Sequence, residues 1–422
     1  MKKKYILLMT ALTISCVVTL SGCDTKATEN PAVSSIQEKS NEEEKGEKVE
    51  VNTSDINDNV DEVEETSEDE GYDDVEKIVK SGYEDVEAFL DEEYANKRFQ
   101  GVALVAQGDE IKFAKAYGYA DYDENRENKL TTRFAIASNT KQFTAAAIMQ
   151  LVEEKKINLD DTIDKYFPKY QYANKITVKQ LLQMRSGIPD YLNEIDLFMK
   201  SEECLSILKD YENDAYFDKY VEDERWSEDT ILKSLYLTDL CFEPGECYDY
   251  CNTNYYLLGL IIEQASGLSF EEYVEQNIFK PCKMITSSMK TVESDAKGHG
   301  SDVSGEIEAN PDFTYAAGNI YANVYDMFRW NRMLHKGNIL SKESYEQMIT
   351  PVDGYGYGLF INDGIIRHSG VIDGFNSNTE YNPKNDITII VMENSDETTD
   401  ILDAKYDTSI IREMINNWQN NN

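Results

Sequence analysis

The chain has 422 residues, and its 80 Asp and Glu against 41 Lys and Arg give a formal net charge of −39, with only three His. This balance supplies no basic face, so it argues against nucleic-acid binding and against electrostatic adsorption to anionic lipid. The sequence also lacks Cys-x-x-Cys pairs and His-Glu-x-x-His motifs, and we therefore expect no metal site and no cofactor.

The N-terminus predicts export from the cell. A basic start at residues 1–4 precedes an apolar run over residues 5–20 that is too short for a stable transmembrane helix. The run ends in Leu-Ser-Gly-Cys at residues 20–23, which resembles the lipobox of bacterial lipoproteins. The resemblance implies that residues 1–22 are removed and that the protein is anchored on the extracellular face of the cell membrane through lipidated Cys23. The alternative is an ordinary secretory signal with a chance cysteine.

Residues 23–75 are predicted to form an acidic disordered tether. This segment is rich in Glu, Asp, Asn and Ser and has few large apolar side chains, so it cannot bury enough apolar surface to offset the entropy lost on ordering. As a flexible coil of about 50 residues it would span roughly 40 Å, and more where its charges repel one another. We expect it to lift a folded domain, residues 76–422, away from the membrane.

The folded part begins with a predicted helix near residues 86–94 and a hairpin of strands 101–106 and 110–116 that turns at Gly108 and Asp109. An amphipathic helix follows Ser138. A polar, largely helical middle, three more strands and a closing helix complete the chain, over residues 158–314, 358–361, 376–381, 387–392 and 403–418.

Strand patterns at both ends around a helical middle predict an α+β fold. We expect an antiparallel sheet formed by the N- and C-terminal strands and flanked by helices. A helical subdomain inserted between those strands would leave a cleft beside the sheet.

The first stretch that suggests chemistry is Ser138-Asn139-Thr140-Lys141, at the start of the amphipathic helix. Residues three apart on a helix share a face, so the hydroxyl and the amine would lie one turn apart, where the amine could activate the serine. The N–H groups and dipole of the helix N-terminus would favour developing negative charge. The same spacing recurs at Ser206, Ser287 and Ser294, where a solvated surface is the simpler interpretation.

Two later motifs single out Ser138. Tyr250-Cys251-Asn252 stands shortly before Leu-Leu-Gly at residues 257–259, and His368-Ser369-Gly370 follows a strand-like run. In this order, the three motifs resemble those of the serine β-lactamase-like superfamily. Class C β-lactamases, serine D-alanyl-D-alanine carboxypeptidases and β-lactamase-fold esterases look most similar. The resemblance covers roughly residues 85–416 and implies a β-lactamase/transpeptidase-like fold.

The resemblance assigns the catalytic roles as follows. Ser138 would be the nucleophile, and Lys141 or Tyr250 would take its proton, once burial and mutual charge have lowered their pKa values. Sequence does not decide between these two bases. The backbone N–H groups of Ser138 and Val371 would form the oxyanion hole.

The remaining motif residues would bind substrate. Asn252 should orient Lys141 and the substrate amide. His368, with Ser369 and Gly370, stands where the family more commonly has Lys-Thr-Gly or a close variant, and it would offer a polar or cationic contact for a substrate carboxylate. The sequence also departs from the family at Cys251, where serine is common.

These motifs together predict a membrane-tethered serine hydrolase. It would act through an acyl-enzyme on cell-envelope amide or ester bonds, as a penicillin-binding or D-alanyl-D-alanine carboxypeptidase-type protein. The alternatives are a β-lactamase or carboxylesterase on the same site, or a penicillin-binding sensor lipoprotein that acylates without turnover. We expect a peptidoglycan-like peptide, a β-lactam or a small ester as the substrate, and a monomeric protein. His368 in place of lysine favours a peptidase or esterase.

Overall fold

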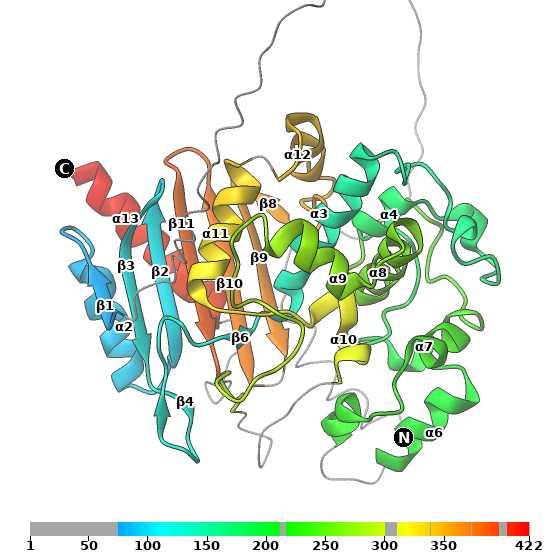
Figure 1. Cartoon of the computed structure of the whole chain (residues 1–422), viewed down its shortest axis with the longest axis horizontal. Coiled ribbons are helices and arrows are strands. Elements are labelled where there is room, and N and C mark those ends of the chain that lie inside the picture. The colour runs from blue at the N-terminus through cyan, green and yellow to red at the C-terminus, as the bar shows by residue number, and fades with distance from the viewer. Residues whose placement is uncertain are drawn as a thin grey trace, which may run out of the picture. The chain divides into compact units, whose positions relative to one another are not determined.

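The computed structural model shows a large antiparallel sheet with helices on both faces (Figure 1). The structure describes residues 75–211, 217–299, 310–337, 339–372, 374–395 and 403–421. The predicted signal peptide, Cys23 and the predicted tether up to residue 74 lie outside these ranges. Within the described ranges, no helix combines the length and the apolar character needed to cross a membrane.

The sheet has seven strands in the order β1-β3-β2-β11-β10-β9-β8. Their bounds are β1 Lys77–Val79, β2 Gly101–Gln107, β3 Glu110–Tyr117, β8 Phe360–Asn362, β9 Ile365–Ile372, β10 Phe375–Asn382 and β11 Ile387–Glu393. β2 pairs antiparallel with β11, so that Ala103 faces Val391 and Val105 faces Ile389. Strands from the two ends of the chain therefore share one sheet, and the predicted α+β fold is confirmed.

Three strand predictions need correction. β9 was not predicted from the sequence pattern, because Arg367, His368 and Ser369 interrupt its apolar residues. β1 was not predicted, because its three residues are too few to show an alternating pattern. β8 begins at Phe360 instead of residue 358, because Gly358 adopts a φ of 68° and approaches α3 closely. A Cβ at Gly358 would lie 2.4 Å from the carbonyl oxygen of Lys141, so the position suits glycine and serves as a turn against the helix.

Both faces of the sheet are buried. Helices α2 (Glu84–Ala95) and α13 (Asp403–Asn421) cover one face. The side chains buried there come from both helices and from alternate residues of three strands: Val86, Leu90, Ala103, Val105, Phe113, Ile387, Ile389, Val391, Ile411 and Ile415. The intervening residues of β2 and β11, such as Leu104 and Ile390, belong to the larger core on the opposite face. Strands that are apolar on both faces are expected to lie between two layers of helices.

The larger core joins the sheet to the helical part of the chain. Its helices are α3 Thr140–Glu153, α4 Val178–Leu182, α5 Ile195–Phe198, α6 Glu202–Tyr211, α7 Glu228–Leu235, α8 Asn252–Ser266, α9 Phe270–Val274, α10 Pro311–Gly318, α11 Val324–His335 and α12 Lys342–Met348. Short 3-10 and π turns lie at Ala137–Asn139, Ile163–Lys165, Ala173–Lys175, Phe217–Glu222 and Glu275–Phe279. Two small antiparallel sheets have two strands each. One pairs β4 (Tyr119–Asp121) with β5 (Arg126–Glu127), and the other pairs β6 (Phe134–Ala135) with β7 (Tyr321–Ala322).

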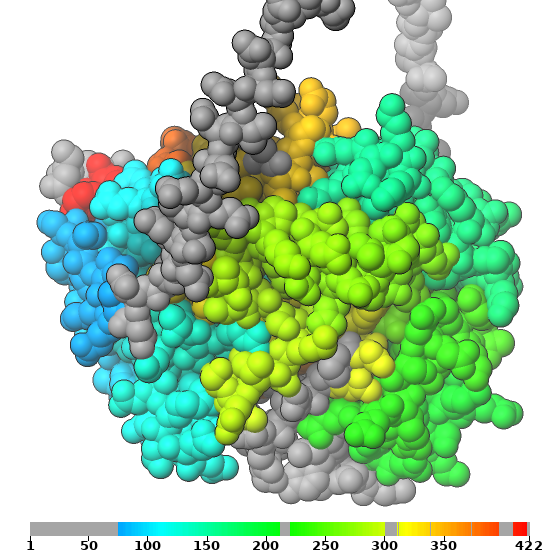
Figure 2. Space-filling model, viewed as in Figure 1, coloured from blue at the N-terminus to red at the C-terminus, as the bar shows by residue number. Residues whose placement is uncertain are grey.

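Helix α8 is the centre of the helical part. Each residue from Asn252 to Ile262 is buried, as expected for a helix that is surrounded by protein on all sides. Gly259 lets it pack closely on α10, because a Cβ there would lie 2.4 Å from the Cβ of Ala316. Figure 2 shows the segment that follows α8, in yellow-green, between the sheet on one side and the region of α6 and α7 on the other.

Candidate active site

Ser138 lies in the 3-10 turn Ala137–Asn139, which runs directly into α3. Ala137 adopts a φ of 45°, a left-handed conformation that is rare for a residue with a Cβ and that often marks a functional site. The turn is held to the sheet because Ser377 of β10 donates to the carbonyl of Ile136 (2.8 Å) and accepts from the side chain of Asn139 (2.8 Å). These contacts fix the backbone on both sides of a partly exposed serine hydroxyl.

Lys141 is completely buried beneath Ser138. Its Nζ lies within hydrogen-bonding distance of three oxygen atoms, namely Oγ of Ser138 (2.9 Å), Oδ1 of Asn252 (2.8 Å) and the carbonyl oxygen of Ala317 (2.8 Å). Burial disfavours the ammonium form and lowers the pKa of Lys141 to about 7, although the carboxylate of Asp190 acts in the opposite direction. A large fraction of this lysine is therefore neutral near neutral pH.

The neutral form of Lys141 has the orientation of a general base. A neutral amine has two N–H groups and one lone pair, and the Ala317 carbonyl and Asn252 Oδ1 can only accept hydrogen bonds. Both N–H groups are therefore directed to these two oxygen atoms. The lone pair is left facing the hydroxyl of Ser138, from which it can take a proton.

Tyr250, the second candidate base, lies two residues before the start of α8. Its ring centre is 5.2 Å from Nζ of Lys141. The ring stacks on Phe360 of β8 with the two planes within 9° of parallel, and its centre is 6.2 Å from that of His368. The structure thus brings Ser138, Lys141 and Tyr250 together, and Nζ of Lys141 lies 2.9 Å from Oγ of Ser138.

His368 of β9 is almost fully buried, with 1% of its surface exposed. Its Nδ1 lies 2.6 Å from the carbonyl oxygen of Ser369, which can only accept, so Nδ1 carries the proton. Nε2 then accepts from the hydroxyl of Tyr355 at 3.2 Å. Burial, reinforced by the charges of Lys141 and Arg367, lowers the pKa of His368 to about 3.

Of the two contacts expected of His368, polar or cationic, its lowered pKa favours the neutral polar one. Sequence could not reveal this, since both Tyr355 and the burial of the ring depend on the tertiary fold. A neutral polar contact with substrate stays a prediction.

Gly370 brings β9 against the nucleophile. A Cβ at this position would lie 2.1 Å from the carbonyl oxygen of Ile136 and 2.9 Å from the backbone nitrogen of Ser138. Only glycine permits so close an approach. It places the segment that continues into Val371 beside the Ser138 turn, where the predicted oxyanion hole would form. That hole, and the roles of Ser369 and Gly370 in substrate binding, stay predictions.

Sequence reasoning missed two groups in the site. One is the Ala317 carbonyl, which any residue would offer and which no sequence signal can identify. It is available because α10 ends at Gly318, and the last carbonyl groups of a helix have no N–H partner within it. The other is Asp190, whose carboxylate accepts from the backbone N–H of Asn252 (3.1 Å) and from its side-chain Nδ2 (2.8 Å). The stretch Ser-Gly-Ile-Pro-Asp-Tyr at residues 186–191 stands out in the sequence, but the role of its aspartate does not.

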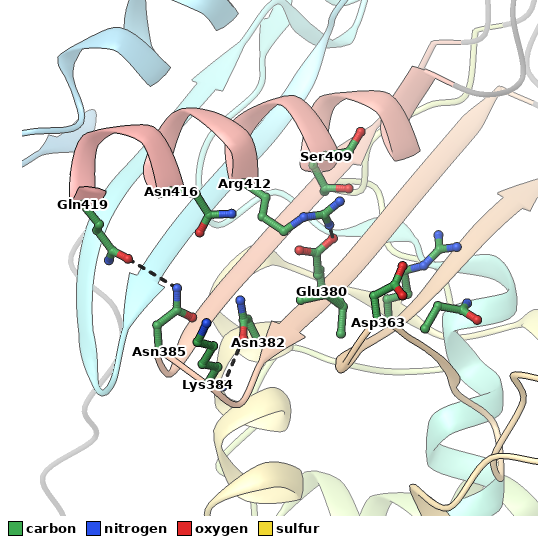
Figure 3. Close-up of a pocket in the computed structure, with 13 residues that line it drawn as sticks. Asp363, Glu380, Asn382, Lys384, Asn385, Ser409, Arg412, Asn416 and Gln419 are labelled. Atoms are coloured by element: carbon green, nitrogen blue, oxygen red, sulfur yellow. Dashed lines mark hydrogen bonds and ion pairs between the residues drawn. The ribbon is translucent and has the colours of Figure 1, made fainter. Parts of the chain in front are cut away.

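A hollow of about 720 Å³ lies beneath α13 on the face of the sheet that carries Arg367 rather than His368 (Figure 3). Its lining is polar and includes Glu380, which pairs with Arg412. None of the predicted catalytic residues lines it.

Comparison with known proteins identifies the family. The beta-lactamase family model, described as "Beta-lactamase", matches residues 86–410. "Putative penicillin-binding protein PbpX" of Bacillus subtilis is 30% identical over 305 residues, which are 70% of this chain and 71% of that protein. Protein flp of Staphylococcus aureus is 27% identical over 342 residues, which are 75% of this chain but only 64% of flp, so the chain spans somewhat less than two thirds of that relative.

The fold is shared with solved structures. The crystal structure of a penicillin-binding protein from Bacillus halodurans superposes with a TM-score of 0.63 and 26% identity, over 77% of this chain and 98% of that one. The resemblance inferred from the three motifs is thereby confirmed. With a family match that runs from α2 into α13, this chain belongs to the beta-lactamase family, among its members related to penicillin-binding proteins.

Proposed function

We propose that this protein is a serine hydrolase that forms an acyl-enzyme with cell-envelope amide or ester substrates, as a penicillin-binding or D-alanyl-D-alanine carboxypeptidase-type protein. One observation carries the proposal. The fully buried Lys141, whose burial lowers its pKa to about 7, contacts the hydroxyl of Ser138 at 2.9 Å. A serine held against a neutral amine has the base that it needs in order to attack a carbonyl carbon.

The reaction would proceed in two halves. Lys141 takes the Ser138 proton as Oγ bonds to the substrate carbonyl carbon, and the oxyanion is stabilised by the N–H groups of Ser138 and Val371. The leaving amine or alcohol departs with a proton from Lys141 or Tyr250, and an ester on Ser138 remains. Water then attacks that ester, gives its proton to the same base and releases the acid, which restores the free serine.

A panel of substrates with intact-mass detection tests this proposal. The purified folded part would be incubated with a penicillin, nitrocefin, a D-Ala-D-Ala peptide and a nitrophenyl ester. A lasting adduct on Ser138 with penicillin supports a penicillin-binding protein or a sensor, and fast return to the native mass supports a β-lactamase. If none of the four reagents acylated Ser138, the proposed function would be wrong.

A carboxylesterase is the second candidate, and the neutral His368 favours it. Penicillins and D-Ala-D-Ala peptides carry a carboxylate, and His368 offers them no positive charge. An ester substrate without a carboxylate does not need a positive charge at position 368.

His368→Lys should therefore raise the reactivity toward carboxylate substrates. A charge-assisted hydrogen bond contributes about 1.5–3 kcal/mol, so we expect the kcat/KM ratio of a penicillin to a neutral ester to rise by about ten-fold or more. His368→Gln is the matched control, since it replaces one neutral polar side chain by another, and its ratio should stay close to that of the unmodified protein. Equal ratios in the lysine and glutamine variants would contradict a charge-based preference.

We also propose that lipidated Cys23 tethers the protein to the outer face of the membrane. The observation behind this is Leu-Ser-Gly-Cys at the end of the apolar run. Cys23→Ser in the full chain should remove label from a radioactive fatty acid and release the protein from the membrane fraction after cell breakage. Unchanged labelling of this variant would show that Cys23 is not the lipidated residue.

A further inference from the structure

Asp190 lies in the segment after α4, almost fully buried, with 2% of its surface exposed. Its Oδ2 accepts from the backbone N–H of Asn252 (3.1 Å), from Nδ2 of Asn252 (2.8 Å) and from Nδ2 of Asn193 (2.8 Å). Its Oδ1 accepts from the backbone N–H groups of Leu192 (2.8 Å) and Asn193 (3.4 Å). Each of these partners is an N–H donor, which is the environment that an ionised carboxylate requires.

These contacts decide which way the Asn252 amide faces. The NH₂ group of Asn252 points at Asp190, so its Oδ1 must face the opposite way, toward Nζ of Lys141 at 2.8 Å. A reversed amide would place the Oδ1 of Asn252 against the carboxylate and its NH₂ against Lys141. Two acceptors would then face each other in a buried site, which is costly.

We propose that Asp190 is a positioning residue for the Ser138–Lys141 pair. Asp190 accepts from the backbone N–H and from the side-chain NH₂ of Asn252. It thereby holds the Asn252 oxygen toward Lys141, so that the lone pair of the neutral amine faces Ser138. This inference rests on the proposed function, because it concerns the same base. Asp190 positions this pair through its hydrogen bonds to Asn252.

Replacing Asp190 by asparagine would disrupt this arrangement. An asparagine has one acceptor oxygen where Asp190 has two, so it cannot accept from Asn252 and from the Leu192 and Asn193 N–H groups at once. When its NH₂ group faces Asn252, the Asn252 amide must turn its oxygen away from Lys141. Lys141 then accepts a hydrogen bond from the Asn252 NH₂ and donates one of its own N–H groups to the oxygen of Ser138. A lysine that donates to Ser138 cannot remove its proton.

The charge of Asp190 also acts on Lys141. The carboxylate raises the pKa of Lys141 against the larger lowering effect of burial. Removing the carboxylate should therefore lower that pKa further and extend activity to lower pH. The other titratable or aromatic groups that face Lys141 are Cys251, Tyr250, Tyr255 and the neutral His368, and those near Asp190 are Tyr191, Glu194, Asp249 and Cys251.

The test compares pH profiles of kcat/KM for a nitrophenyl ester in the full chain. For Asp190→Asn we expect the plateau to fall by about a hundred-fold, the loss typical of a misdirected catalytic group, and the acid limb to move to lower pH. Asp190→Ser serves if the asparagine variant does not fold, because serine can still accept from the Leu192 N–H but no longer reaches Asn252. Glu194→Gln is the control, since it removes a nearby carboxylate that contacts the Asp190 backbone N–H and not Asn252.

A double-mutant cycle separates positioning from general support of the fold. If Asp190 acts through Asn252, Asp190→Asn should cost little more activity once Asn252→Ala is present. Fully additive losses, or a plateau in a folded Asp190 variant equal to that of the unmodified protein, would overturn the inference. An unmodified protein that acylates no substrate at Ser138 would instead overturn the proposed function itself.

Discussion

Ser138→Ala should abolish turnover of every substrate that the unmodified protein accepts. Ser138 is the proposed nucleophile, and removal of a serine nucleophile typically lowers kcat by a factor of at least about 10⁴. Steady-state kinetics with a nitrophenyl ester and intact mass after penicillin treatment both report this loss.

Ser206→Ala is the matched control, because Ser206 belongs to another Ser-x-x-Lys pattern. Ser206 and Lys209 are both exposed on α6. The surface interpretation of that pattern thus agrees with the structure, and this variant should keep full activity. Substantial turnover by Ser138→Ala would mean that the nucleophile lies elsewhere.

Lys141→Met should reduce acylation by about 10³-fold, within the range that a general base contributes. It should also lower the free energy of unfolding by about 1–3 kcal/mol for each of the two buried oxygen atoms that lose a donor, Asn252 Oδ1 and the Ala317 carbonyl. Stopped-flow acylation and urea unfolding measure the two effects separately.

Two further variants distinguish a base from a mere cation at position 141. Lys141→Arg keeps a positive charge but has no lone pair, so we expect it to be as inactive as the methionine variant. Lys209→Met removes the exposed lysine of the Ser206 pattern and should change nothing. An active arginine variant would show that Lys141 acts through its charge, and Tyr250 would then become the better candidate for the base.

Most of the sheet was predictable because β2 and β11 are short, almost continuous apolar runs, which are typical of strands buried on both faces. β2, β3, β10 and β11 each begin and end within one residue of the predicted bounds. β8 was misplaced by two residues because Gly358 approaches the backbone of Lys141, a contact made by a distant segment. Local pattern specifies a strand, but tertiary contacts decide where it begins.

The pairing of Ser138 with Lys141 was also predictable, because helical spacing and the order of the motifs along the chain were enough. The electrostatics of this pair could not be predicted from the sequence. The lowered pKa of Lys141 depends on complete burial between α3, α8 and α10, and the lowered pKa of His368 depends on the burial of its ring. Asp190 is distant in sequence from Asn252, and hydrogen-bond direction between two side chains leaves no periodic signal.

The pH dependence of Ser138 acylation is the most direct test of the central claim, that a neutral Lys141 activates Ser138. Its measurement would follow intact mass after rapid quenching of a reaction with a nitrophenyl ester. We expect one adduct on the peptide that contains Ser138. Its rate of formation should rise about ten-fold per pH unit below a pKa of about 7 and level off above it, because only the neutral amine can take the proton. An adduct on another residue, or a rate that is constant from about pH 5 to pH 8, would contradict the account.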